Sequence, residues 1–451
     1  MPPGPAPSRC RLRPAALLLA LLLGFAAPVA AQDLAVRELL PNGVTLLVAE
    51  RPALPIVVLR AWIRAGAILD SPGKAGLANL TAELLTRGTR TRTGRQIDQA
   101  IEFVGGSLSS EGGRDGIVVS LSVLKKDLAL GLDLVADVLL NPTFPQEEFE
   151  RKVQEIRAAV QRAEESPETV ASKAFRRLVF DPHPYGTPVE GTVESLGRLT
   201  RDDVAAFYTE TYRPQETVVV AVGDVTRDEI RAALEQRLGG WPMRPRATAT
   251  PTAAPLGGPA KTRTIQKGVT QASVLLGQAG IGRHHPDYYA LQVASYILGG
   301  GSASRLYHRL REERGLVYSV YSYLAPGRYG AVFELGFQTR NEEVREALEI
   351  VRRELTRLRQ ERVSEEELAR AKAYLIGSFP LRMDTTGEVA GLLLTIEEQG
   401  LGLDYPARFP RLIEAVSVQQ IFQAVRTHWD PDAMTLVVVG NLKAAGLPAS
   451  E

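Results

Sequence analysis

The hydrophobic positions of the first half follow two periods, which together predict strands covered by helices. Runs of β-branched and apolar residues predict strands at 44–49, 56–63 and 116–123. The first two of these strands are expected to pair with each other. Apolar residues at helical spacing predict helices at 74–85, 97–104, 128–140 and 146–164.

The second half repeats this mixture of elements. Strands are expected at 272–277 and 331–339, and helices at 288–298, 341–359 and 365–376. Strands in runs, with helices gathered between them, are typical of an α+β fold and not of a doubly wound parallel sheet. The sequence therefore predicts α/β-sandwich layers, in which helices pack on a mostly antiparallel sheet.

Two similar segments, one near the end of each half, indicate a duplication. Tyr-Arg-Pro at 212–214 leads into an apolar strand and then Gly-Asp-Val, and Trp-Asp-Pro at 429–431 leads into an apolar strand and then Gly-Asn-Leu. The proline and the glycine both recur at an offset of 217 residues, a period that means domain duplication and not a solenoid. Residues 244–263 are rich in proline and glycine, so we expect a linker between homologous domains at 32–243 and 264–446.

The first 31 residues have the pattern of a secretory signal peptide. Arginines at 9, 11 and 13 precede an apolar run of 13 residues, which is too short to span a bilayer, and small residues at 29–31 predict cleavage before Gln32. Cys10 is the only cysteine, so the mature chain has no disulfide and no thiol nucleophile. Export without disulfides favours a bacterial periplasm.

The charge balance bears on the class of partner. Loss of the three arginines changes the net charge from +1 to −2, which argues against a nucleic acid as partner. No second long apolar run follows, so no membrane association is expected after cleavage. About 420 residues are too many for a single core, in agreement with two domains.

The stretch 298–324 combines three glycines, a basic amphipathic helix and a tyrosine-rich strand. A serine at 302 or 304 can cap this helix, and Gly315 suits the left-handed position just past its end. Arg311 and Tyr318 flank that turn and can direct polar groups to one place. Gly299, Gly300 and Gly301 follow a helix and lack the Gly-Lys-Ser/Thr ending of a phosphate loop, so we interpret them as a turn that positions the next helix near a substrate.

The helix KAGLANLTAELLTRGT, residues 74–89, resembles the signature helix of the zinc peptidases related to pitrilysin, insulin-degrading enzyme and the mitochondrial processing peptidase, the M16 family. In that family the helix carries His-x-x-Glu-His, which supplies two zinc ligands and the general base. The matching residues here are Asn79, Ala82 and Glu83. The resemblance therefore implies a degenerate zinc motif.

The resemblance continues along nearly the whole mature chain. It places Glu155, in the segment 153–156, at the position of the family's third zinc ligand, and the segment 181–188 resembles the family's His-Pro-Tyr-Gly region. The five histidines are at positions 183, 284, 285, 308 and 428, so none lies in the expected zinc helix. His284 and His285 are adjacent and expected to diverge, and His428 is expected to have no ligand partner.

The segment Arg-Glu-Glu-Arg-Gly-Leu-Val-Tyr matches the family's Arg-x-x-x-x-Leu-x-Tyr turn through Arg311 and Tyr318. In the family these two side chains reach the substrate backbone near the zinc. The resemblance thus implies a non-catalytic subunit of a periplasmic, heterodimeric zinc peptidase. This chain would need no cofactor, and a homologous partner with His-x-x-Glu-His would hold the zinc and share the peptide substrate.

Two other interpretations remain open. The chain is alternatively a metal-free pseudopeptidase that binds peptides or acts as a scaffold, as a homodimer. A third interpretation places a hard cation on Asn79, Glu83 and Glu155, although two carboxylates and an amide provide few ligands. The ordinary alternatives are solvated carboxylates at 83 and 155 and, for the second half, a surface arginine beside a tyrosine of a sheet.

Overall fold

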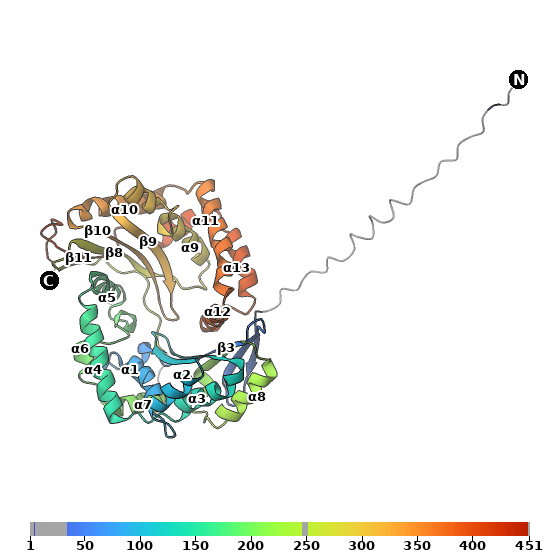
Figure 1. Ribbon diagram of the computed structural model, residues 1–451. Coiled ribbons are helices and arrows are strands. Elements are labelled where there is room, and N and C mark those ends of the chain that lie inside the picture. The colour runs from blue at the N-terminus through green and yellow to red at the C-terminus, as the bar shows by residue number, and fades with distance from the viewer. Residues whose placement is uncertain (1–3, 5–33, 246–250, 450–451) are drawn as a thin grey trace. The chain divides into compact units, whose positions relative to one another are not determined.

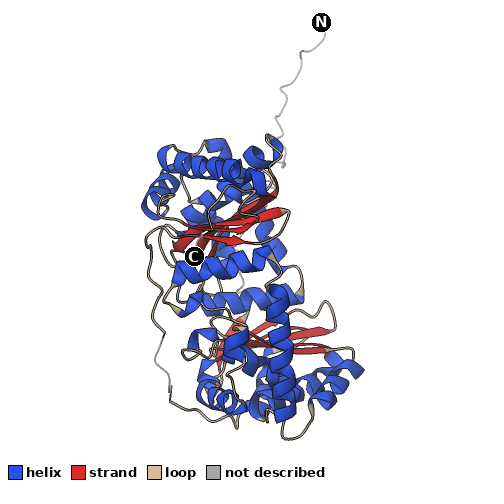
Figure 2. Cartoon of the chain, turned by 90° about the vertical axis from the view of Figure 1, so that its left-hand side faces the viewer, coloured by secondary structure: helices blue, strands red, loops and turns tan. Residues whose placement is uncertain are grey.

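Two mixed sheets, each covered by helices, organise the computed structural model of the protein (Figures 1 and 2). The structure describes residues 4, 34–245 and 251–449, so the expected signal peptide, except Gly4, and the segment 246–250 of the expected linker lie outside the described residues. Among the helices that the structure describes, none combines the length and apolarity needed to cross a membrane.

The first half contains a six-stranded sheet in the order β1-β2-β6-β3-β5-β4. Its strands are β1 (Val36–Leu39), β2 (Thr45–Glu50), β3 (Ile56–Ile63), β4 (Ser107–Gly112), β5 (Ile117–Leu124) and β6 (Thr217–Gly223). Its helices are α1 (Leu77–Leu84), α2 (Gly94–Phe103), α3 (Leu128–Leu140), α4 (Gln146–Ala163), α5 (Pro167–Phe180), α6 (Val193–Leu196), α7 (Arg201–Thr211) and α8 (Arg227–Leu238).

The second half contains a five-stranded sheet in the order β7-β11-β8-β10-β9. Its strands are β7 (Thr262–Gln266), β8 (Gln271–Gly280), β9 (Val317–Pro326), β10 (Ala331–Arg340) and β11 (Thr435–Gly440). Its α-helices are α9 (Tyr288–Gly299), α10 (Val344–Gln360), α11 (Glu365–Ser378), α12 (Thr386–Gln399), α13 (Tyr405–Glu414) and α14 (Val418–His428). β7 begins at Thr262, so it includes the last two residues of the expected linker.

The two sheets share one topology, which confirms the predicted α+β fold of two related domains. In each sheet one inner strand, β6 or β11, is parallel to one neighbour and antiparallel to the other. From there the strands continue antiparallel, through β3, β5 and β4 in the first half and through β8, β10 and β9 in the second. β6 and β11 are the two segments whose similarity indicated the duplication.

The predicted pairing of the strands at 44–49 and 56–63 is wrong, because β6 lies between β2 and β3. Thr45 of β2 is opposite Val218 in a parallel pair, and Val57 of β3 is opposite Gly223 in an antiparallel pair. All seven residues of β6 are buried. At an inner position of the sheet, β6 forms hydrogen bonds with a neighbouring strand on each side. A β2–β3 hairpin would move this apolar strand toward the edge of the sheet.

Each half covers one face of the other half's sheet with a helix. α12 of the second half packs on β3 and β6, and α5 of the first half packs on β8 and β11 (Figure 1). Val389, Ala390 and Leu393 of α12 are buried against the first sheet, and Ala171 and Phe175 of α5 are buried against the second. The halves therefore share two cores that neither completes alone.

A polar network lies where the halves meet. The Tyr185 hydroxyl donates to Asp115 Oδ1 at 2.5 Å, and the backbone N–H of Arg328, from the second half, donates to Asp115 Oδ2 at 3.0 Å. Arg328 also donates to the carbonyl oxygen of Glu398 at 2.8 Å. Burial, together with the negative charge of Asp115, raises the pKa of Glu398 to about 7.

The shared core leads to a first prediction. Leu393→Ala, which removes a fully buried side chain of α12, should lower the free energy of unfolding by roughly 2–5 kcal/mol because it leaves a cavity against the first sheet. Denaturant unfolding followed by tryptophan fluorescence and far-UV circular dichroism measures this loss. Leu381→Ala is the control, since Leu381 is 66% exposed. Independent unfolding of the two halves in the unsubstituted protein would contradict the shared core.

The second prediction concerns pH. Because the pKa of Glu398 is raised in the folded state, the folded protein holds this proton more tightly than the unfolded chain does. The carboxyl group therefore has no effect on stability below its unfolded pKa, destabilises the fold progressively as the pH rises from there, and reaches its full destabilising effect above about 7. Glu398→Gln should raise the melting temperature at pH 8 and leave it nearly unchanged at pH 4.5, whereas Glu366→Gln, at an exposed position, should change neither. An equal gain at both pH values would contradict this assignment.

Candidate functional site

The helix that resembles the zinc signature is α1, and it is buried along nearly its whole length. Leu77, Leu80 and Leu84 belong to the core of the first half, and Asp70 accepts backbone N–H groups of Gly76 and Ala78 at 2.8 Å, which satisfies the start of the helix. α1 packs against the edge strand β4, against α4 and against α7. Its apolar face, which includes the fully buried Ala82, accounts for its position without the polar side chains at 79 and 83.

Asn79 and Glu83 are neighbours on α1. The Asn79 amide Nδ2 donates to Glu83 Oε1 at 3.0 Å, and Asn79 is only 7% exposed. Ala82 is completely buried and offers no polar atom. β4 approaches this helix closely, since a Cβ atom at Gly112 would lie 2.5 Å from the Cα atom of Asn79. The helix thus presents one amide and one carboxylate, and no imidazole.

Glu155, on α4, meets Glu83 only through a lysine. The Lys152 ammonium lies 3.3 Å from Glu83 Oε2 and 3.2 Å from Glu155 Oε2, and the lysine side chain is 13% exposed. Arg151 also pairs with Glu155 at 3.2 Å. Lys152 was not among the predicted site residues, although its place one helical turn before Glu155 is a signal that could have identified it. The chain's own cation therefore lies between the two carboxylates that were considered as metal ligands.

Arg311 and Tyr318 are in contact, as their places around the turn suggested. The Arg311 guanidinium carbon lies 4.6 Å from the centre of the Tyr318 ring and 5.2 Å from that of Tyr307. Arg311 Nη1 also donates to the backbone oxygen of Tyr318. Gly315, with φ of +63°, has the left-handed conformation expected for the turn between them. Arg311 is held by two aromatic rings and one hydrogen bond.

The helix that carries Arg311 is short and wide. Residues Tyr307–Glu312 form a π-helix, a geometry that occurs often at functional sites. Leu306 and Leu310 are fully buried and fix the helix to the second core. The Ser304 hydroxyl accepts the N–H of Tyr307 at 3.4 Å, so Ser304, of the two candidate caps, makes the capping bond.

Tyr318 lies on β9, the edge strand of the second sheet. Its side chain is 79% exposed, and its hydroxyl makes no hydrogen bond with the described residues. Tyr321 and Tyr323 follow on the same strand, with ring centres 5.6 Å apart, and both are partly exposed. One edge of β9 has no strand beside it among the described residues. This edge can accept an extended peptide as an additional strand.

Gly299, Gly300 and Gly301 connect α9 to the following helix. A Cβ atom at Gly299 would lie 3.0 Å from the Ser322 nitrogen of β9, and one at Gly300 would lie 2.5 Å from the Tyr296 Cα atom. Gly301 has more space, with its nearest neighbour at 3.6 Å. Glycine at 299 and 300 therefore allows α9 to end close against β9. Contact of this segment with substrate stays a prediction.

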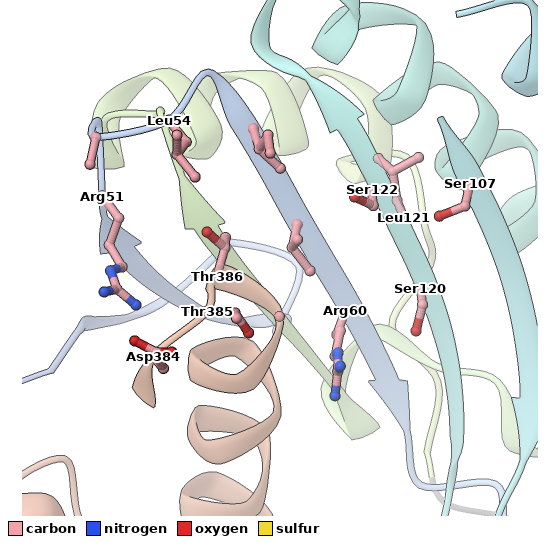
Figure 3. A pocket seen from close by; sticks show the side chains of 14 residues that line it. Arg51, Leu54, Arg60, Ser107, Ser120, Leu121, Ser122, Asp384, Thr385 and Thr386 are labelled. Carbon is pink, nitrogen blue, oxygen red and sulfur yellow. The ribbon is translucent and has the colours of Figure 1, made fainter. Parts of the chain in front are cut away.

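A pocket of about 640 Å³ lies on the first sheet beside the start of α12. Figure 3 shows Arg51, Arg60, Ser107, Ser120 and Thr385 among the side chains around it. Thr385 caps α12, and a Cβ atom at Gly391 would come within 2.9 Å of Arg60 Nη1, so the glycine provides room for the arginine. This pocket was not predicted from the sequence, although the arginine inside the apolar run of β3 was a signal for it.

His428 has partners, contrary to expectation. Its Nε2 donates to Asp287 Oδ2 at 2.8 Å, and the His285 ring lies edge-on to the His428 ring with a centre distance of 4.8 Å. His285 and Asp287 precede α9, and His428 is the last residue of α14. The sequence did not reveal this cluster because 141 positions separate Asp287 from His428.

Comparison with known proteins finds similarity to one peptidase family along both halves of the chain. Residues 46–193 match the insulinase family, peptidase family M16, and residues 198–375 match the peptidase M16 inactive domain. An uncharacterized zinc protease of Streptomyces coelicolor is 30% identical over 364 residues, which are 78% of each chain. One from Mycobacterium leprae is 35% identical over 291 residues, which are 64% of this chain and 65% of the relative.

Solved structures agree with this fold. The peptidase M16 inactive domain from Pseudomonas fluorescens has a TM-score of 0.84 at 28% identity, covering 92% of this chain and 99% of that one. A protease from Helicobacter pylori has a TM-score of 0.83 at 20% identity, covering 90% and 99%, and supports the fold alone. With both halves matched and the two-sheet topology repeated, the chain belongs to the M16 peptidase family.

Proposed function

We propose that this chain is the non-catalytic subunit of a periplasmic, heterodimeric M16 zinc peptidase. It would contribute a peptide-binding surface and the Arg311–Tyr318 pair to a homologous partner that carries His-x-x-Glu-His and the zinc. The observation that carries the proposal is the contrast between α1, where Asn79, Ala82 and Glu83 replace the motif, and the assembled pair at Arg311 and Tyr318.

The geometry of the pair supports a role toward a peptide backbone. Arg311 uses Nη1 for the Tyr318 carbonyl, while its other N–H groups make no hydrogen bond with the described residues. The Tyr318 hydroxyl also makes no hydrogen bond with the described residues, and the Tyr318 side chain is largely exposed. Two donors fixed in advance can bind a peptide carbonyl and stabilise the negative charge that develops on its oxygen during hydrolysis.

The edge of β9 supports the substrate class. An extended peptide beside this strand would form backbone hydrogen bonds that do not depend on its sequence, and the exposed tyrosines would contact its side chains. Tyr318 and Arg311 lie at the beginning of this edge. The proposed substrate is therefore an unfolded or extended peptide segment, and not a folded protein or a nucleic acid.

The test is co-expression with a homologous chain that carries His-x-x-Glu-His, followed by peptide cleavage by the purified complex. Arg311→Ala and Tyr318→Phe should each lower kcat/KM by roughly 10²–10³, the usual effect of losing one oxyanion donor. Steady-state kinetics with a quenched fluorescent peptide measures this. The loss should appear mainly in kcat, since the donors act on charge that is absent from the ground state.

Two controls separate this role from a loss of structure. Arg309→Ala changes the same short helix, where Arg309 pairs with Glu313 at 2.6 Å, and Tyr374→Phe removes an exposed hydroxyl on α11. Neither should change kcat/KM. Unchanged kinetics in Arg311→Ala and Tyr318→Phe would refute the proposed role, and an inactive complex that still binds peptide would favour the scaffold interpretation.

A further inference from the structure

The cluster of His285, Asp287 and His428 has the composition of a metal site. One ligand atom from each residue lies within 4.8 Å of the other two. Among the described residues, no other three His, Cys, Asp or Glu side chains are brought together in this way. The cluster belongs to the second half, whereas the helix that resembles the zinc signature belongs to the first.

Helix ends hold two of the three residues, and His285 lies in the turn that leads into α9, where its carbonyl oxygen accepts the N–H of Tyr288 at 3.0 Å. Asp287 immediately precedes α9, and His428 is the last residue of α14. Gln278 of β8 donates to the His428 carbonyl oxygen at 2.6 Å, and the adjacent Trp429 stacks on Phe333 with ring centres 4.1 Å apart. The ligand positions are therefore set by packed strands and helix ends and not by a free loop alone.

The polar contacts within the cluster converge on one oxygen. Asp287 Oδ2 is 2.8 Å from His428 Nε2 and 3.9 Å from His285 Nδ1. A carboxylate only accepts, so His428 Nε2 must carry the proton of that short contact. His285 Nδ1 accepts the backbone N–H of Asp287 at 3.1 Å. Each imidazole thus has a nitrogen within 4 Å of the same carboxylate oxygen, and only His428 hydrogen-bonds to it.

We propose that these three residues bind a divalent transition metal, Zn²⁺ in the first instance, at a site separate from the expected catalytic position. Two imidazoles and one carboxylate form a ligand set that zinc accepts, and water would complete a tetrahedral geometry. The metal takes the place of the proton between His428 Nε2 and Asp287 Oδ2, and that proton moves to His428 Nδ1. Binding of the metal by His285 Nδ1 also replaces the hydrogen bond that this nitrogen accepts from the backbone N–H of Asp287.

Exposure permits entry of the metal. The side chains of His285 and Asp287 are 38% and 39% exposed, and that of His428 is 17% exposed. The bound ion would join the start of α9 to the end of α14. The ion would stabilise this junction, and α9 continues through Gly299–Gly301 toward the helix that carries Arg311.

The experiment uses the full mature chain, stripped with a chelator and dialysed. Zn²⁺ titration followed by elemental analysis should give one ion per chain, and Co²⁺ should produce a visible absorption band of low-coordinate cobalt. His285→Gln, Asp287→Asn and His428→Gln should each weaken zinc binding by at least about 100-fold, since even indirect partners of a metal ligand cost 10–100-fold. Bound Zn²⁺ should also raise the melting temperature.

Matched histidine controls define the outcome. His308→Gln removes an exposed histidine that pairs with Glu312, and His284→Gln removes the neighbour of His285. Both should retain zinc. Absence of zinc binding at micromolar metal, or equal loss in His308→Gln, overturns the proposal. If the His428→Gln variant does not fold, the His285→Gln variant alone tests whether the cluster binds zinc.

The same titration separates this site from the proposed function. Glu83→Gln with Glu155→Gln should leave zinc binding intact, since those carboxylates belong to the first half. Once His285 is replaced, the chain should retain no tightly bound zinc. Zinc that persists in His285→Gln and disappears in the Glu83/Glu155 variant would overturn both the present site and the degenerate first-half motif.

Discussion

The reciprocal packing of α5 and α12 on the two sheets is the constraint on which the rest of the structure depends. β6 and β11 are buried at every position because helices of their own half cover one face and a helix of the other half covers the second. Exposing either sheet would place a large apolar face in water. The halves therefore form one body, and groups at their boundary, such as Asp115 and Tyr185, have their geometry set by that packing.

The duplicated topology allows equivalent helices of the two halves, α1 and α9, to be compared. α1 lies against the edge strand β4, and α9 lies against the edge strand β9, at equivalent places in the two sheets. Both helices are held mainly by apolar residues, so the chemistry of the polar positions on α1 is not what fixes that helix in place. In the first half those positions are Asn79 and Glu83. In the second half the edge strand presents Tyr318.

The sequence could predict features whose determinants are local. The helix Gln146–Ala163 has a clear period of buried residues, and the Arg311–Tyr318 contact follows from a seven-residue turn fixed by Gly315. Features that depend on distant segments were missed. The burial pattern of β6 does not say which strands flank it, and no periodicity shows that α5 covers the other half's sheet. The partners Asp287 and His428 meet only once both helix ends are packed.

Lys152 shows how α1 and α4 remain packed although α1 carries no imidazole. Its ammonium is largely covered and lies within 3.3 Å of both Glu83 and Glu155. Carboxylates near a helix interface repel each other unless a positive charge lies between them, and removal of that charge from a covered position is costly. Here the positive charge belongs to the chain itself. The positive charge between these helices is therefore supplied by α4 itself, so a change of the residues at 79 and 82 leaves the Glu83–Lys152–Glu155 contact in place.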